Sequence, residues 1–121
     1  MTDVRHTAGR RGEELAAEHL ERLGFQVLAR NHRTRYGELD LVAYDGETLV
    51  FAEVKTRRSG TRDPWESLHD RKQSKVRRMA ISWLSDGADR PHGAHLRFDG
   101  IAVLLDASGD LIRLDHLEAA F

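Results

Sequence analysis

An Asp-Gly pair between two apolar runs is the feature that most constrains the fold of this chain. Asp45-Gly46 lies between "ELDLVAY" and "ETLVFAEV". An Asp-Gly pair flanked by alternating apolar residues is a strong short-range signal of a β-hairpin with a two-residue turn. Such a turn at 45–46 pairs position 44 with 47 and position 38 with 53. The sequence therefore predicts an antiparallel hairpin over residues 36–57 with a defined register.

Side chains alternate between the two faces of a strand, so this hairpin is expected to have one apolar and one mixed face. The apolar face should lie under a helix. It comprises Leu39, Leu41, Ala43, Val50, Ala52 and Val54. The mixed face has apolar residues near the turn and charged residues toward the open end. The charged ones are Glu38, Asp40, Glu53 and Lys55.

The carboxylates of the mixed face would conflict with one another without a counter-charge. In the predicted register Glu38 stands directly opposite Glu53, and Asp40 lies diagonal to it. Like charges that face each other across strands destabilise by roughly 0.2–1 kcal/mol, and burial forces one carboxyl to take up a proton. Carboxylate oxygens with waters suit a hard cation such as Mg²⁺ or Mn²⁺. The residues thus favour a metal site here.

Lys55 has two interpretations. It stands two residues after Glu53 on the same face, where it could hold the charge of an attacking hydroxide or of a phosphoryl oxygen. Alternatively, it simply neutralises Glu53 as a surface ion pair. Asp99 is similarly open: it either reaches the same site from a neighbouring strand or pairs with Arg97.

The remaining elements complete an α/β sandwich. Residues 9–24 read as a helix with an apolar stripe that ends before Gly24, and residues 64–85 read as a second helix. The first stripe comprises Leu15, Ala16, Leu20 and Leu23; the second comprises Val76, Met79, Ala80, Trp83 and Leu84. Strands are expected at 25–31, 95–106 and 111–117. The order of helix, three strands, helix and two strands predicts one mixed sheet covered by helices, formed by residues 1–121 as a single domain.

Composition excludes several classes of protein. The chain has no cysteine, so disulfide frameworks and thiolate metal sites are ruled out. The longest apolar run, at 101–105, is too short to cross a bilayer, and no secretory signal is visible. We therefore expect a soluble cytoplasmic protein without a membrane partner. The net charge is only −1, but basic residues gather around 30–35, 57–62 and 71–78, as solvated faces or as a track for phosphates.

Several motifs together resemble those of a known family. Asp40 followed by Glu53-Val54-Lys55 resembles the PD-(D/E)xK nuclease motif. The chain is more closely similar to the YraN-like family of bacterial proteins, which is related to the archaeal Holliday junction resolvases. The matching stretches cover most of the chain; they are "GRRGEELAAEHL", "RNHR", "GELDLVA", "VFAEVKTR", "SLHDRKQSKV", "RFDG" and "AAF".

The resemblance implies a restriction-endonuclease-like fold with a central mixed sheet flanked by helices. It also implies roles at a site that holds one or two Mg²⁺ or Mn²⁺ ions. Asp40, Glu53 and the Val54 carbonyl would bind the metal, and Lys55 would be the catalytic lysine. Glu13 matches a further acid of the resolvase site, and Glu38 belongs to the family's "GE-x-D" signature. Leu39 stands where the motif's name has proline, which is often missing in this superfamily.

The function implied is that of a Mg²⁺-dependent endonuclease that hydrolyses phosphodiester bonds in structured or branched DNA. Basic side chains would hold the flanking phosphates: Arg33, Arg35, Arg57, Arg58, Lys72 and Lys75. Kinship with resolvases also implies a homodimer, because a four-way junction has two symmetric cleavage points. Two alternatives stay open. One is a non-catalytic nucleic-acid-binding or assembly protein on a nuclease fold, and the other is a structural role in which the acids pair with arginines.

Overall fold

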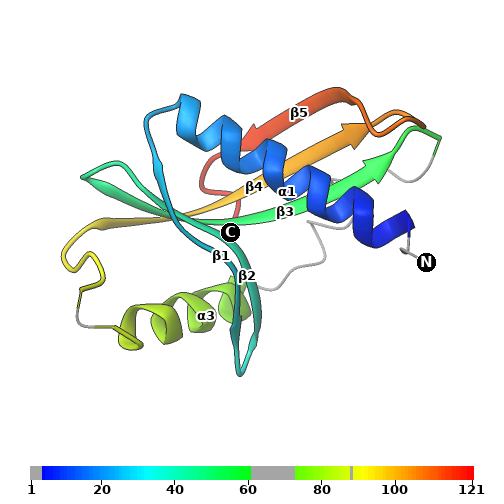
Figure 1. Ribbon diagram of the computed structural model, residues 1–121. Coiled ribbons are helices and arrows are strands. Elements are labelled where there is room, and N and C mark those ends of the chain that lie inside the picture. The colour runs from blue at the N-terminus through cyan, green and yellow to red at the C-terminus, as the bar shows by residue number, and fades with distance from the viewer. Residues whose placement is uncertain (1–3, 61–72, 88) are drawn as a thin grey trace.

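In the part of the chain that the structure describes, two helices pack on a five-stranded sheet, in the order that the sequence predicts (Figure 1). The computed structural model describes residues 4–60, 73–87 and 89–121. The elements are α1 (Val4–Arg22), β1 (Gln26–Thr34), β2 (Gly37–Tyr44), β3 (Thr48–Arg58), α3 (Gln73–Ser85), β4 (His95–Leu105) and β5 (Leu111–Leu117). The strands at 95–106 and 111–117 match to within a residue. Residues 64–72 of the predicted second helix lie outside the described residues.

The sheet is mixed, as predicted. Its strands lie in the order β1-β2-β3-β4-β5. Neighbours are antiparallel except β3 and β4, which run parallel side by side from Thr48↔His95 to Arg58↔Leu105. A parallel pair needs a long crossover, and here the connection contains α3. This α/β arrangement is consistent with the restriction-endonuclease-like architecture.

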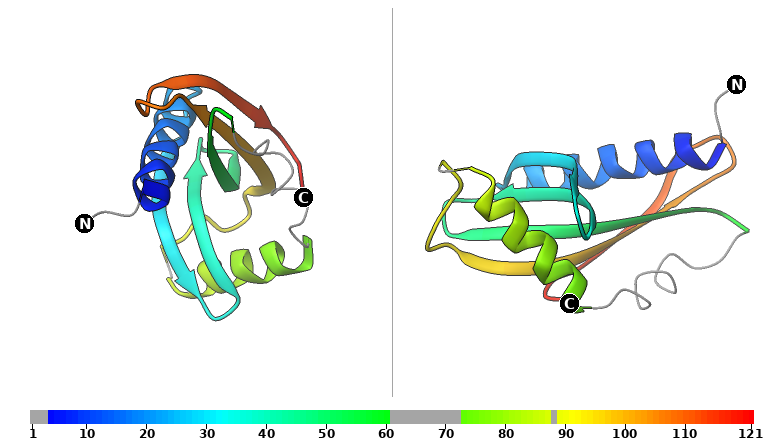
Figure 2. Two further views of the ribbon diagram at one scale, coloured as in Figure 1. Left: turned by 90° about the vertical axis from the view of Figure 1, so that its right-hand side faces the viewer. Right: turned by 90° about the horizontal axis from the view of Figure 1, so that it is seen from below.

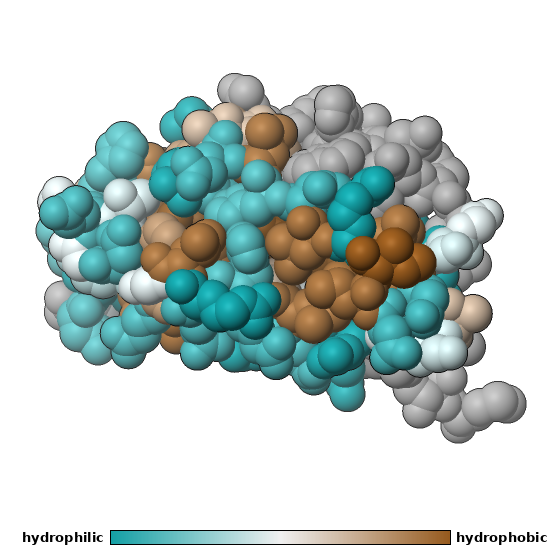
Figure 3. All heavy atoms as spheres, turned by 90° about the horizontal axis from the view of Figure 1, so that it is seen from above, coloured by the Kyte–Doolittle hydropathy of each residue, from teal (hydrophilic) through white to brown (hydrophobic). Residues whose placement is uncertain are grey.

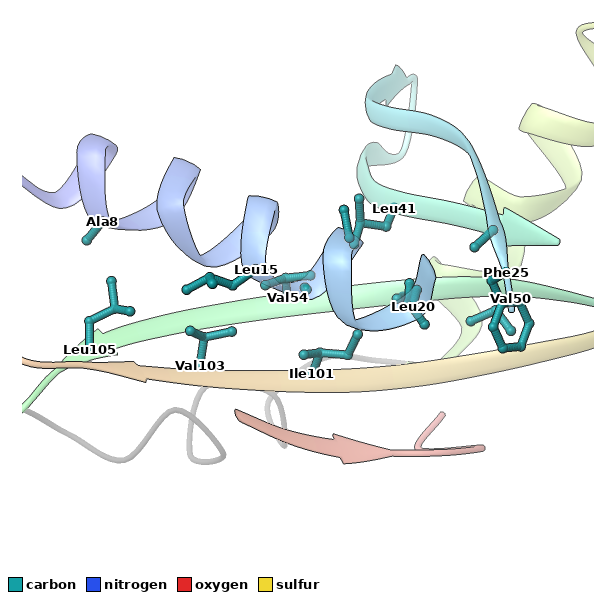
Figure 4. Close-up of a cluster of buried hydrophobic side chains, with 14 residues drawn as sticks. Ala8, Leu15, Leu20, Phe25, Leu41, Val50, Val54, Ile101, Val103 and Leu105 are labelled. Carbon is teal, nitrogen blue, oxygen red and sulfur yellow. The ribbon is translucent and has the colours of Figure 1, made fainter. Parts of the chain in front are cut away.

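One hydrophobic core lies between α1 and the sheet (Figure 4). Leu15, Ala16 and Leu20 of the predicted helical stripe are at most 7% exposed. They pack against side chains of three strands, namely Leu41, Val50, Val54, Ile101, Val103 and Leu105. The stripe ends there: α1 stops at Arg22, Gly24 adopts a φ of +98°, and Leu23 is 54% exposed. The prediction that Leu23 continues the stripe was wrong, because the helix ends before it can face the core.

A second core lies between α3 and the opposite face of the sheet, so the two helices cover different faces (Figure 2). Val76, Met79, Ala80 and Trp83 form the predicted stripe and are at most 3% exposed. They pack with Val42, Leu49, Phe51 and Phe98. Leu39 also belongs to this core, although alternation predicted the other face. The β1–β2 hairpin bends toward α3 at its turn (Figure 1), and Leu39 belongs to the part of β2 next to that turn.

The predicted register of the β2–β3 hairpin was wrong by two residues. Tyr44 pairs with Leu49, and Leu41 pairs with Ala52. The cause is Asp45, whose Oδ1 accepts hydrogen bonds from the backbone N–H groups of Glu47 and Thr48 at 2.9 and 2.7 Å. These bonds lower the pKa of Asp45, and that from Thr48 contributes most. Asp45 therefore precedes the turn, and Gly46, with a φ of +101°, occupies its first central position.

Because the error is an even number of residues, it leaves the faces of residues 41–44 and 49–54 unchanged. It does remove the predicted pairing of Glu38 with Glu53, because the observed β2–β3 pairs follow the shifted register and end at Leu41↔Ala52. The predicted conflict between these two carboxylates directly across the hairpin was therefore wrong.

The surface combines hydrophilic side chains with separate hydrophobic patches, as the view onto the α1 side shows (Figure 3). Exposed large hydrophobic side chains among the described residues are Leu23, Ile81, Leu96, Leu111, Ile112 and Leu117. Across the described ranges, no helix combines the length and the hydropathy that crossing a bilayer would require.

Candidate functional site

Three carboxylates converge where α1 passes over β2. Glu13 comes from the helix, and Glu38 and Asp40 come from the strand. One oxygen from each lies within 4.8 Å of the others, and all three residues are partly buried. All three were predicted as site residues from the sequence. Hereafter we call Glu13, Glu38 and Asp40 the acidic trio.

Gly12 determines how closely α1 can approach the sheet at this point. A Cβ atom at position 12 would lie 2.8 Å from the Cβ of Thr56 in β3 and would overlap the Thr56 hydroxyl. Glycine is thus the residue that fits this contact. Because Glu13 follows directly, the close packing of Gly12 on Thr56 brings the Glu13 carboxylate to the sheet.

Asp40 is held by the neighbouring strand as well as by its own. Its Oδ2 accepts a 2.8 Å hydrogen bond from the backbone N–H of Val54. The carboxylate takes this N–H group just beyond the last paired residues, Leu41 and Ala52. The N–H and C=O groups of one strand residue project to the same side, so the Val54 carbonyl also faces β2. This places the predicted carbonyl ligand beside the acidic trio.

Glu53 and Lys55 lie on β3, next to the acidic trio in the sheet but not part of it. Glu53 is only 6% exposed, and the Lys55 Nζ lies 4.0 Å from its Oε1. A buried carboxylate is costly without compensating partners, so this lysine is well placed to offset its charge. The proximity fits both interpretations of Lys55, because its side chain is 35% exposed and so remains accessible to an anion.

The predicted phosphate-binding residues fall into two groups on different sides of the molecule. Arg33 and Arg35 lie near the β1–β2 turn, at the bottom of Figure 1, where Lys75 of α3 also comes close to Gly37. Arg57 and Arg58 lie at the end of β3, on the right of Figure 1. Arg33 is 86% exposed and only 3.9 Å from Glu38, a weak surface pair. Lys72 lies outside the described residues.

Asp99 is fully buried and is the partner of Arg97, the second of the two predicted alternatives. Its oxygens accept bonds from Arg97 at 3.0–3.2 Å and from the Ala119 N–H at 3.0 Å, and they contact His116 Nε2 at 2.7 Å. His116 Nδ1 in turn lies 2.9 Å from His19 Nε2 on α1. The sequence did not point to either histidine, because residues 97 positions apart meet only in the folded chain.

The acidic trio is chemically suited to a hard divalent cation. Its donor set consists of carboxylate oxygens, which Mg²⁺ and Mn²⁺ prefer. Mg²⁺ holds its ligand oxygens at about 2.1 Å, so two opposite ligands lie about 4.2 Å apart. Oxygens that already lie within 4.8 Å of one another reach that spacing with small side-chain movements. The residues therefore fit the metal that the motif implies.

Comparison with known proteins shows relatives along the whole chain. The profile of "Uncharacterised protein family UPF0102" matches residues 12–103, which include the acidic trio, Glu53 and Lys55. A UPF0102 protein of Acidothermus cellulolyticus is 50% identical over 110 residues, 84% of this chain and 83% of its own. One from Pelotomaculum thermopropionicum is 46% identical over 125 residues and covers all of both chains. A third, from Frankia casuarinae, is 48% identical over 116 residues, 93% of this chain and 94% of its own. On this evidence the chain belongs to the UPF0102 family, the YraN family that its motifs suggested.

Proposed function

We propose that this protein is a divalent-metal-dependent endonuclease that hydrolyses phosphodiester bonds in structured or branched DNA. The observation that supports it best is the convergence of Glu13, Glu38 and Asp40 from two elements, with oxygens within 4.8 Å of one another. Three carboxylates gathered at one point repel each other unless a cation neutralises them. A helix glycine and an interstrand hydrogen bond maintain this arrangement, which is the behaviour expected of a ligand set.

The chemistry of the site follows from its charges. A divalent ion held by the trio would lower the pKa of a bound water and neutralise charge on a phosphate. Asp40, fixed by the Val54 N–H, would orient the ion relative to β3. The Lys55 ammonium would donate a hydrogen bond to a phosphoryl oxygen as its negative charge grows. Glu53, 4.0 Å from that ammonium, would hold Lys55 in position or serve as a further ligand.

The two basic groups would position the DNA on either side of the acidic trio. Arg33 and Arg35 at the β1–β2 turn and Arg57 and Arg58 at the end of β3 would contact phosphates. Phosphate contacts fix the position of a duplex without reading its sequence, so recognition would depend on DNA shape and fall steeply with salt.

The test is cleavage of labelled four-way junction, flap, single-stranded and duplex DNA with Mg²⁺ or Mn²⁺. Asp40→Asn and Lys55→Ala should abolish cutting. Glu18→Gln is the matched control, because Glu18 is an exposed acid on the same helix as Glu13 and lies outside the trio. Metal binding is measured by calorimetry on the same samples.

The possible results separate the proposal from its alternatives. Metal-dependent cutting that is lost in both site variants but kept in Glu18→Gln supports a nuclease. DNA binding without cutting of any substrate would instead favour a non-catalytic nucleic-acid-binding or assembly protein. If the protein neither cuts DNA nor binds metal, the acids have a structural role only.

We further propose that the active form on a four-way junction is a homodimer, because the junction offers two symmetric cleavage points. Sedimentation at micromolar concentration, with and without junction DNA, tests this. A monomer under both conditions would contradict it.

A further inference from the structure

A surface pocket of about 320 Å³ lies between the β1–β2 turn and α3, and the acidic trio is not among its lining residues. Among the described residues, its lining comes from residues 35–36 of the turn and residues 78–82 of the helix. The lining side chains are Arg35, Tyr36, Arg78, Ile81 and Ser82. The volume falls at the lower end of pockets that hold small ligands or parts of larger ones.

Tyr36 forms the aromatic wall of this pocket. The guanidinium carbons of Arg35 and Arg78 lie 5.2 and 5.8 Å from the centre of its ring. The turn that presents Tyr36 is fixed by Thr34, whose Oγ1 accepts from the Tyr36 N–H at 3.1 Å and donates to the Gly37 carbonyl at 2.8 Å. The backbone that carries Tyr36 is therefore fixed before any ligand arrives, and its side chain packs against the core below α3, which lowers the entropic cost of binding.

The described residues that line the pocket give it a positive charge. None of them is acidic. Among the residues that the structure describes, neither Arg35 nor Arg78 forms an ion pair, and both are exposed. Ile81 adds an apolar side chain that is 62% exposed, and Ser82 adds a hydroxyl. The pocket thus combines a flat aromatic and apolar surface with two cations.

This combination matches an unstacked nucleotide. Aromatic rings and guanidinium planes stack on bases, and arginines bind the adjoining phosphates. A base inside a continuous duplex has both faces covered by its neighbours, so only an unpaired or flipped-out nucleotide can present a face to Tyr36. We propose that the pocket binds an unpaired nucleotide of a DNA substrate, which extends the proposed function by naming a preference for single-stranded segments.

The position of the pocket suits a substrate that also reaches the acidic trio. Tyr36 lies in the turn and precedes Asp40 by four residues, which spans at most about 13 Å at ~3.3 Å per residue. That distance corresponds to at most about four nucleotide steps of B-form DNA. An unpaired nucleotide held at Tyr36 would thus place a strand–duplex boundary near the carboxylates.

Fluorescence anisotropy without divalent metal tests the pocket independently of cleavage. The probes are fluorescein-labelled (dT)₁₂ and a blunt 12-base-pair duplex. Tyr36→Leu removes the ring, Tyr36→Phe keeps it, and Arg78→Gln removes one exposed charge. The matched controls are Tyr44→Leu, an aromatic outside the pocket, and Arg113→Gln on β5, at the sheet edge opposite β1.

We expect Tyr36→Leu to weaken (dT)₁₂ binding roughly 5- to 100-fold, while duplex binding changes less than twofold. Tyr36→Phe should bind like the wild type, and Arg78→Gln should weaken (dT)₁₂ binding and reduce its dependence on salt. Both control variants should retain wild-type affinity. Circular dichroism checks the fold of each variant. If Tyr36→Leu does not fold, Arg78→Gln alone tests the pocket, because replacing an exposed side chain should not disturb the fold.

Three results would each overturn the pocket inference. The first is an equal loss of affinity for (dT)₁₂ and for the duplex, and the second is an unchanged (dT)₁₂ affinity in both Tyr36→Leu and Arg78→Gln. The third is a wild-type protein that does not bind (dT)₁₂. Cleavage assays on the same proteins judge the nuclease proposal separately. If the protein cuts duplex or junction DNA but its affinity for (dT)₁₂ does not depend on Tyr36, only the pocket inference is refuted. Tyr36-dependent (dT)₁₂ binding without any cutting would refute the nuclease alone.

Discussion

The Asp40 carboxylate accepts a 2.8 Å hydrogen bond from the backbone N–H of Val54 on the adjacent strand. One side chain thus serves both the sheet and the candidate metal site. Its Oδ2 satisfies a backbone donor of β3, while an Asp40 oxygen also belongs to the acidic trio. The stability of the sheet and the affinity for metal are therefore coupled at this residue.

Two substitutions of Asp40 should separate these roles. Asp40→Ala leaves the half-buried Val54 N–H without its acceptor, so the free energy of unfolding should fall by about 1–3 kcal/mol. Asp40→Asn keeps an acceptor oxygen and should lose much less stability. Both variants should lose metal binding, because the charged ligand is gone. Urea denaturation and calorimetric titration with Mn²⁺ measure the two effects. Equal destabilisation by both substitutions would contradict the role given to the hydrogen bond.

Glu13→Gln should have opposite effects with and without metal. Without metal, removing one of three converging charges should raise the melting temperature or leave it unchanged, because carboxylate repulsion decreases. With millimolar Mg²⁺ or Mn²⁺ the wild type should gain stability by mass action, and the variant should gain little. Glu18→Gln, on the same helix, should respond to metal like the wild type. A metal-induced shift of the same size in Glu13→Gln would argue against Glu13 as a ligand.

The packing of Gly12 on Thr56 predicts a sharp contrast between two glycines of α1. Gly12→Ala should destabilise by about 1–3 kcal/mol, because the new methyl group overlaps the Thr56 side chain. It should also weaken metal binding by displacing Glu13. Gly9→Ala is the matched control: among the described residues, no atom beyond its own helix backbone and chain neighbours lies within 4 Å of its Cβ position, so it should stabilise the helix by about 0.5–1 kcal/mol. Denaturant unfolding measures the stability of both variants. If Gly9→Ala is destabilised as well, the loss in Gly12→Ala comes from the helix and not from the contact with Thr56.

The buried His19–His116–Asp99 chain should make stability depend on pH. Burial, with the charges of His116 and Arg22 adding to it, lowers the pKa of His19. The unfolded chain then binds more protons than the folded one just below pH 6.5, so the free energy of unfolding should fall as the pH decreases through this range. His19→Gln should flatten this dependence, whereas His95→Gln, at an exposed position, should not. Urea midpoints between pH 5 and pH 8 measure the slopes, and identical slopes in wild type and His19→Gln would refute the assignment.

A second decrease in the free energy of unfolding is expected at lower pH, from Asp99. Burial raises the pKa of Asp99, but hydrogen bonds from His116, Arg97 and the Ala119 backbone outweigh it, so the pKa is lowered overall. A carboxylate with a lowered pKa contributes stability above its unfolded pKa near 3.9 and loses it as the pH falls below that value. Asp99→Asn should therefore be less stable than the wild type at neutral pH, with a difference that narrows toward pH 3. A difference that stays constant between pH 7 and pH 3 would assign the loss to packing alone.

The order of elements and the two buried faces could be predicted because both follow from local periodicity. The hairpin register could not be predicted, because the Asp45 carboxylate accepts hydrogen bonds from two backbone N–H groups and moves the turn by one residue. Moving the turn by one residue shifts the pairing of the two strands by two residues. The assignment of residues 41–44 and 49–54 to the two faces was still correct, since a shift of two residues preserves alternation. Leu39 did not follow the pattern; it lies next to the turn of the β1–β2 hairpin, whose bend is a tertiary feature that alternation does not encode.

The acidic trio was predictable residue by residue, and the resemblance to the resolvases already assigned Glu13 to the same site as Asp40. Spacing alone links only Glu38 and Asp40 on one strand, whereas Glu13 reaches them in the folded chain because α1 docks closely at Gly12. The same limit applies to the Tyr36 pocket, which exists only where the hairpin turn meets α3. It also applies to His19 and His116, which lie at opposite ends of the chain.

The parallel pairing of β3 with β4 has a consequence for synthesis of the chain. The acidic trio, Glu53 and Lys55 all precede Arg58, whereas β4 begins at His95. N-terminal segments leave the ribosome first, so the nascent chain contains every acid of the site before it contains β4, which pairs with the edge of β3 opposite β2. During that interval β3 has an unpaired edge that can join any other extended chain. The edge of β3, the strand that bears Glu53 and Lys55, is thus open to wrong pairing during translation until β4 has been made.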